Sequence, residues 1–198
     1  MTRRTDKTLD WIKHGARYGD EHLFIFRTRF DDMENPRNRL VVPRLVLESV
    51  DWVNMVALDT EKRSVMVRQY RFGMGYSTVE TPGGMVDAGE TPLESAQREL
   101  LEETGYGGGQ WTYLGAVEPN PAVHDNLCHH FLAEGVEHVA DADPGDGEAI
   151  RVELMDEAAV RQAVLDGELR HALALSALSR VFDLWPRPFP GGSDLWIR

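Results

Sequence analysis

The chain lacks the features that mark secreted and membrane-spanning proteins. Its 198 residues contain a single cysteine, Cys128, which excludes a disulfide framework. No apolar run approaches the roughly 18 residues that a transmembrane helix needs, and the arginine-containing N-terminus lacks the apolar segment of a secretory signal. We therefore predict a cytoplasmic protein that buries its core without disulfides.

Positive charge is also scarce. The chain has 33 acidic residues against 21 lysines and arginines, and its formal net charge is −12. Nucleic acids and anionic membranes carry the same sign, so this balance excludes nonspecific binding to either. We expect no nucleic-acid partner and no membrane partner, with cations as the local counter-charge.

What the chain does contain is a helix with well-marked ends. The segment Thr91-Pro92-Leu93-Glu94 places a hydroxyl at the N-cap, proline at the first helical position and glutamate at the third. Gly105 supplies the stop. Leu93, Ala96 and Leu100 recur at helical spacing, which predicts an apolar stripe that packs on a core.

An acidic sector adjoins that stripe. Glu99, Glu102 and Glu103 stand at i, i+3 and i+4, so they share roughly 100° of the helix surface, which we expect to stay open to solvent and ligand. Crowded carboxylates either raise their pKa values or bind a divalent cation, and oxygen ligands select a hard ion such as Mg²⁺. Taken alone, three glutamates more often form a plain solvated face.

The spacing of residues beyond these three glutamates argues against a plain solvated face. From Gly84 the chain reads G-x5-E-x7-R-E-L-x-E-E-x-G as far as Gly105, and this pattern resembles the signature of the Nudix hydrolases. Tyr106 stands where the family more often has an aliphatic residue. The resemblance implies an α/β fold, an α/β/α sandwich with a mixed sheet and a loop-helix-loop motif, which cleaves a nucleoside diphosphate linked to another moiety.

The same resemblance implies roles for the acidic cluster. Glu99 and Glu103 look like direct metal ligands, with Glu102 sharing or bridging ions and the carbonyl of Gly83 as a further ligand. The cofactor is expected to be Mg²⁺, with Mn²⁺ as an alternative. Arg98 would orient the carboxylates through charge-assisted hydrogen bonds, and Glu90 would hold the loop. For Arg98, a plain surface ion pair is the alternative.

Residues outside the signature indicate which branch of the Nudix hydrolases the chain resembles. Residues 51–58 and 64–71 are predicted to be two strands joined by a hairpin turn at 59–62. The stretch 68–71 followed by Glu80-x-Pro-Gly-Gly resembles the ADP-ribose and nucleotide-sugar pyrophosphatases. Pro121, sixteen residues past Gly105, matches a position that recurs in that branch, but Asn126 with His129 and His130 looks closer to nucleotide-sugar variants. The sugar therefore stays open.

Candidate substrate contacts follow from side-chain chemistry. Arg71 and Arg68 could neutralise a diphosphate, and the aromatic residues suited to stack on a base are Trp52, Tyr70 and Tyr76. For Trp52 a core aromatic on a buried strand is equally compatible. His129 and His130 are adjacent on a predicted strand and should point to opposite faces, so at most one of them lines a given pocket.

Hydrolysis also needs a base for the attacking water. The acidic loop over 141–148 resembles the loop that often provides it in this branch, with Glu148 as a further metal ligand and Asp146 as the base. Aspartate is shorter than the glutamate expected there, so Glu102 remains an alternative base.

The remaining sequence is predicted to surround this catalytic part. Residues 22–27 and 39–47 are predicted strands flanking a turn near 35–36, and residues 1–48 are expected to make homodimer contacts as in relatives. The catalytic domain is predicted over 49–185, with helices over 156–165 and 168–185, and 186–198 as an irregular tail.

Three alternatives stay open. The same signature would serve a hydrolase of dinucleoside polyphosphates, coenzyme A or nucleoside triphosphates. A non-catalytic nucleotide sensor with a DNA-binding domain is disfavoured by the acidic balance. An isomerase of the same fold is disfavoured because its cysteine and glutamate context is not recognisable around Cys128.

Overall fold

The computed structural model describes residues 12–23, 25–145, 147 and 149–185. It divides into two compact units, one of residues 1–50 and 118–126 and the other of residues 51–117 and 127–198. Within the described residues, no helix is both long and apolar enough to cross a membrane. The predicted tail over 186–198, together with Asp146 and Glu148, lies outside the described residues.

The first unit is built on a three-stranded antiparallel sheet, in the order β1-β2-β3. Its strands are β1 (Ile12–Leu23), β2 (Phe26–Glu34) and β3 (Val41–Glu48). The predicted strand over 39–47 and the turn near 35–36 are confirmed. The predicted strand over 22–27 is wrong, because the chain reverses there between β1 and β2.

The second unit holds a seven-stranded mixed sheet with the main order β10-β5-β4-β9-β8, to which β6 adds beside β5 and β7 beside β4. The strands are β4 (Trp52–Asp59), β5 (Ser64–Arg71), β6 (Tyr76–Glu80), β7 (Gly83–Met85), β8 (Tyr106–Val117), β9 (Cys128–His138) and β10 (Ile150–Met155). Strands β4 and β9 run parallel, and the other described pairs are antiparallel. The two predicted strands and their hairpin turn are confirmed.

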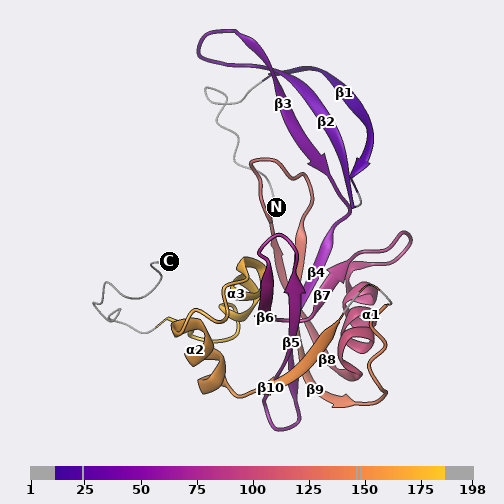
Figure 1. Cartoon of the computed structure of the whole chain (residues 1–198), viewed down its shortest axis with the longest axis vertical. Coiled ribbons are helices and arrows are strands. Elements are labelled where there is room, and N and C mark those ends of the chain that lie inside the picture. Colours follow the sequence, from indigo (N-terminus) through magenta and orange to yellow (C-terminus); the bar gives the residue numbers. More distant parts are fainter. Residues whose placement is uncertain (1–11, 24, 146, 148, 186–198) are drawn as a thin grey trace. The chain divides into compact units, whose positions relative to one another are not determined.

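Helices cover both faces of this sheet (Figure 1). They are α1 (Pro92–Thr104), α2 (Glu157–Leu165) and α3 (Ala172–Leu178). Because side chains alternate along a strand, Val53 and Met55 of β4 pack with Leu100 of α1, while Val56 and Leu58 pack with α2 and α3. These two clusters confirm the predicted α/β/α sandwich.

The helix predicted over 168–185 is wrong in extent. Residues 168 and 169 instead turn back on α2, their backbone N–H groups donating to the carbonyl of Ala163, and α3 begins only after His171. Beyond Leu178 the chain continues in short turns as far as Trp185. Burial of Leu169 in the core holds the connection in this turned form. The shorter helix over 156–165 is confirmed, with Asp156 as its N-cap.

Strands β4 and β5 separate beyond the turn that joins them. Their ladder is confined to Leu58 and Ser64, and beyond it β5 pairs with β6 whereas β4 pairs with β7. Asn54 joins the two sides, donating from Nδ2 to the carbonyl of Pro82 at 3.2 Å and accepting from the Thr81 hydroxyl at 2.5 Å. The link from β6 to β7 is thereby fixed in place.

Candidate active site

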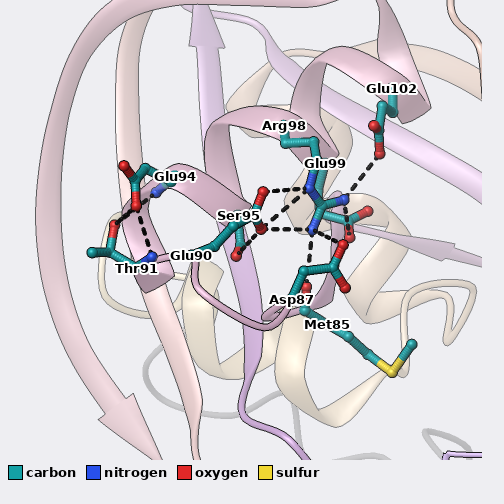
Figure 2. Close-up of polar contacts among 9 residues, drawn as sticks. All are labelled: Met85, Asp87, Glu90, Thr91, Glu94, Ser95, Arg98, Glu99 and Glu102. Carbon is teal, nitrogen blue, oxygen red and sulfur yellow. Dashed lines mark hydrogen bonds and ion pairs between the residues drawn. The ribbon is translucent and has the colours of Figure 1, made fainter.

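Helix α1 begins and ends where the sequence predicts. Thr91 and Glu94 form the reciprocal capping box, with the Thr91 N–H donating to Glu94 Oε2 at 2.7 Å (Figure 2). Gly105 closes the helix at φ 73°, a left-handed conformation that favours glycine. Ala96 and Leu100 are fully buried as predicted, but Leu93 stays 38% exposed, so the packing stripe begins one turn later than expected.

Arg98 is the centre of a polar cluster on α1. Its guanidinium donates to Glu90 at 3.0 Å, to Glu99 at 2.9 Å and to Glu102 at 3.0 Å (Figure 2). It also donates to the carbonyl of Met85 at 3.2 Å, and so ties the loop before the helix to the helix itself. The hydrogen bonds that Arg98 donates to Glu90 are the main cause of the raised pKa of Arg98, and they in turn lower the pKa of Glu90. A plain surface ion pair does not describe this residue.

Glu103 faces β7 rather than solvent. It is 3% exposed, and its Oε2 accepts a hydrogen bond from the Gly83 N–H at 3.0 Å. A side chain at Gly84 would overlap the Glu99 carboxylate, and one at Gly83 would overlap the Val53 carbonyl. Gly84 therefore lets β7 lie close to the acidic helix, and Gly83 lets it lie close to β4.

The acidic sector is therefore only partly open, contrary to expectation. The Glu102 side chain is 47% exposed, that of Glu99 is 15% exposed, and Glu103 is buried. The acidic loop reaches the same helix, since the Asp143 N–H donates to the Glu102 carbonyl at 2.9 Å. This contact brings the start of that loop beside the cluster.

Comparison with known proteins matches residues 48–176 to the NUDIX domain model. The chain belongs to the Nudix family. It is 32% identical over 159 residues to an ADP-ribose pyrophosphatase of Mycobacterium tuberculosis (strain ATCC 25618 / H37Rv), covering 79% of this chain and 76% of that protein. It is also 35% identical over 112 residues to a methanol dehydrogenase activator of Bacillus methanolicus, covering 57% of this chain.

Two further matches agree with this assignment. An ADP-ribose pyrophosphatase of Bacillus subtilis (strain 168) is 35% identical over 104 residues, covering 52% of this chain. The match spans 60% of the length of the Bacillus methanolicus protein and 56% of the Bacillus subtilis one. The crystal structure of an ADP compounds hydrolase superposes with a TM-score of 0.75 at 20% identity, over 89% of this chain and 95% of that one, which shows a shared fold.

Charge and donor type of the Nudix cluster suit a divalent cation. The carboxyl groups of Asp87, Glu90, Glu99 and Glu102 gather around the Arg98 guanidinium, and the buried Glu103 carboxylate belongs to the same helix. Their oxygens are hard ligands, and the excess of negative charge calls for a cation. In the described part of the chain no three acidic, histidine or cysteine side chains are already spaced as metal ligands, which agrees with Arg98 Nη1 holding both Glu99 and Glu102.

The expected substrate residues are spread over several places. Trp52 lies beside the Nudix loop, paired with Met85 on β7. Arg71 is held by the buried Glu80, through Nε to Oε1 at 2.7 Å and Nη2 to Oε2 at 2.6 Å. Tyr70 is exposed and stacks edge-on against Phe72.

Two other expected contacts lie elsewhere. Arg68 projects from the opposite face of β5 to Arg71, and it binds Glu153 at 2.7 Å and also Glu168. Pro121 lies in a turn of the first unit. Substrate contact by Arg68 and by Pro121 stays a prediction.

The adjacent histidines do face different partners. His129 lies 3.1 Å from Asp51 and 3.0 Å from the Tyr113 hydroxyl, whereas His130 is fully buried and lies 3.1 Å from the Ser176 hydroxyl. Reasoning from sequence missed the Glu80 pair with Arg71 and the nearby His171. Glu80 was visible only as part of a motif, since no local pattern tells that a charged strand residue will be buried.

Proposed function

We propose that the chain hydrolyses the pyrophosphate bond of ADP-ribose or a related nucleoside diphosphate sugar, giving a nucleoside monophosphate and a sugar phosphate. Pyrophosphatases of ADP-ribose recur among the relatives, and an ADP-sugar pyrophosphatase of Mus musculus is 36% identical over 95 residues. The observation that carries the proposal is the Arg98 cluster, which gathers Glu99 and Glu102 on the helix whose Glu103 binds Gly83.

The residues that would hold the cation are the Gly83 carbonyl with Glu99, Glu102 and Glu103. A bound Mg²⁺, or Mn²⁺ in its place, would lower the pKa of a water nucleophile and offset charge on the diphosphate. The chain itself holds the proposed ligands in position. Arg98 binds the carboxylates of Glu99 and Glu102, and Glu103 binds the backbone of Gly83. Such positioning carries much of the rate in phosphoryl chemistry.

The general base that activates the attacking water is proposed to come from the acidic loop over 141–148 or from α1. Glu148 is proposed as a further ligand and Asp146 as the base, with Glu102 as the alternative because its carboxylate is the most exposed of the three signature glutamates on α1. Arg71 is proposed to bind the diphosphate. Trp52, Tyr70 and Tyr76 remain the candidates to stack on the nucleobase of the substrate. Pro121 and Arg68 remain candidates for further substrate contacts.

The test is release of nucleoside monophosphate, with and without Mg²⁺, from ADP-ribose, GDP-mannose, UDP-glucose, diadenosine tetraphosphate and a nucleoside triphosphate. A metal-dependent preference for one of the first three supports the proposal and names the sugar. Preference for either of the last two would keep Nudix chemistry but replace the substrate class. No release from any of the five would favour a nucleotide-binding protein without activity or a substrate outside this panel.

A homodimer and a cytoplasmic location are proposed as well. Phe30 of β2 and Leu45 of β3 are paired across the strands of the first unit, and each stays 40% exposed. Paired exposed apolar side chains favour a protein contact over free solvent. Light scattering on the purified chain tests this, and we expect the mass of two copies at micromolar concentration.

A further inference from the structure

Glu80 is a buried charge close to the candidate active site. It ends β6, is 1% exposed, and lies where β4 and β5 have parted. Only Thr81 and Pro82 separate it from Gly83, so the two backbones are within roughly 11 Å of each other. A buried carboxylate is costly unless it is paired, so its partners indicate what it is for.

The main partner is Arg71, bound through two parallel hydrogen bonds of 2.7 and 2.6 Å. The Thr78 hydroxyl also donates to this carboxylate. Burial alone would raise the pKa of Glu80, but the hydrogen bonds from Arg71 and the nearby charges lower it, so the group is ionised at neutral pH. The two-point pairing fixes the plane of the guanidinium as well as its position.

This pairing draws Arg71 along the hairpin. In the ladder Arg71 lies opposite Tyr76, while Glu80 lies opposite Val67, four residues further along β6. The guanidinium therefore reaches diagonally toward the end of β6 that leads into Gly83. The Arg71 side chain nevertheless keeps 40% exposure, so a ligand can reach it.

His171 covers the other side of the carboxylate. This N-cap of α3 places Nδ1 3.5 Å from Glu80 Oε2 and accepts from the Ala174 N–H at 3.4 Å. Burial is the main cause of its lowered pKa, so the ring is neutral at pH 7 and does not compete with Arg71 for the charge of Glu80.

Arg68 also forms a two-point pair with a glutamate, so such a pair does not by itself mark a substrate-binding arginine. It also lies on β5 and binds a glutamate twice, but that glutamate is Glu153 on β10, on the other face of the strand. Of these two pairs, the one formed by Arg71 and Glu80 adjoins the connection to β7.

We propose that Glu80 is a positioning residue that aims Arg71 at a phosphate of the substrate. The inference rests on the proposed function, in which Arg71 binds the diphosphate. Glu80 makes no contact with substrate itself. Its effect passes through the orientation of the Arg71 guanidinium.

A double-mutant cycle of Glu80→Gln and Arg71→Lys tests this. Lysine keeps the charge but cannot pair at two points. We expect either single substitution to raise KM for ADP-ribose about tenfold while kcat stays within about threefold. In the double variant, Glu80→Gln should add no more than about threefold to the effect of Arg71→Lys.

The matched control is Asp59→Asn, at the turn of the neighbouring β4–β5 hairpin. Asp59 is likewise a buried carboxylate, 4% exposed, which accepts from Arg63 Nε at 2.8 Å. It should lower the melting temperature as Glu80→Gln does, yet leave KM unchanged. Equal stability losses with unequal KM values separate positioning from a merely structural role.

Binding of ADP-ribose in EDTA, measured by calorimetry, gives a readout that needs no turnover. A Kd about tenfold weaker in Glu80→Gln supports the proposal even if the wild-type chain hydrolyses none of the compounds tested, which would overturn only the proposed activity. An unchanged Kd and KM in Glu80→Gln, additive effects in the double variant, or no binding by the wild type would overturn the positioning role.

Discussion

Glu103 combines burial with a direct link to the loop backbone, so a small chemical change there should have a large effect. Glu103→Gln keeps an oxygen that can accept from the Gly83 N–H, and the fold should persist. It removes a negative charge from the proposed cation site, so we expect kcat/KM to fall at least 10²-fold. Steady-state kinetics with circular dichroism check this, and near-wild-type rates in a folded variant would refute the metal-ligand role.

His130 should make stability depend on pH. Burial, followed by the charges of Arg180 and His129, lowers its pKa to about 4 from an ordinary 6.5. As pH falls below 6.5, the unfolded chain takes up a proton that the folded chain refuses until about pH 4, so stability is lost over this window. From pH 7 to pH 5 the free energy of unfolding should drop by about 2 kcal/mol through this group.

Urea unfolding at the two pH values measures that drop. His130→Gln, which can still bond the Ser176 hydroxyl, should show a pH dependence smaller by the same amount. His171 has a lowered pKa as well and contributes in the same direction, so the comparison between wild type and variant isolates His130. An identical pH dependence in both proteins would show that the imidazole is not held neutral.

At the scale of elements, the contact between β7 and α1 depends on the absence of a side chain. Gly84→Ala would place a methyl group where the Glu99 carboxylate lies and displace that carboxylate from its position beside Arg98. We expect at least a tenfold fall in kcat/KM and a higher Mg²⁺ requirement. Gly73→Ala is the matched control, because its added methyl group meets nothing within 4 Å. Equal activity in the two variants would mean that the close approach is unimportant.

Elements with strong local signals could be predicted from the sequence, and elements fixed by distant contacts could not. Helix α1 carries its own cap, proline and terminal glycine, and its bounds follow from them. Strand β1 is polar and lacks a clear alternation, so only its pairing with β2 defines it. Helix α3 is short because Leu169 and His171 take up positions on the core and beside Glu80, which no local propensity reveals.

The candidate site divides in the same way. Arg98 and the signature glutamates could be placed because they share one helix, where spacing in sequence fixes spacing in space. The pairing of Arg71 with Glu80 depends on a hairpin register, and the contact with His171 depends on a helix about 90 residues later. Burial of Glu103 depends on how closely β7 approaches α1, which Gly84 permits but does not specify.

At the scale of the whole molecule, the uneven charge of the acidic cluster predicts that a divalent cation stabilises the fold. Four carboxyl groups surround a single arginine, Glu103 adds a fifth on the same helix, and these negative charges repel one another. A cation that binds only the folded chain therefore shifts the unfolding equilibrium. At a free Mg²⁺ concentration 100 times its Kd, the gain is about 2.7 kcal/mol. For a chain of this length that corresponds to a rise of roughly 5–10 °C in the melting temperature.

Thermal unfolding in EDTA and in Mg²⁺ measures the shift, with NaCl at matched ionic strength to account for screening. Glu103→Gln should lose most of the Mg²⁺ effect, because the substitution removes one of the proposed ligands. Asp59→Asn should keep the full shift, since its carboxylate is held at the far end of the β4–β5 hairpin by Arg63. An equal rise with NaCl, or an undiminished rise in Glu103→Gln, would place the cation somewhere other than the Nudix helix.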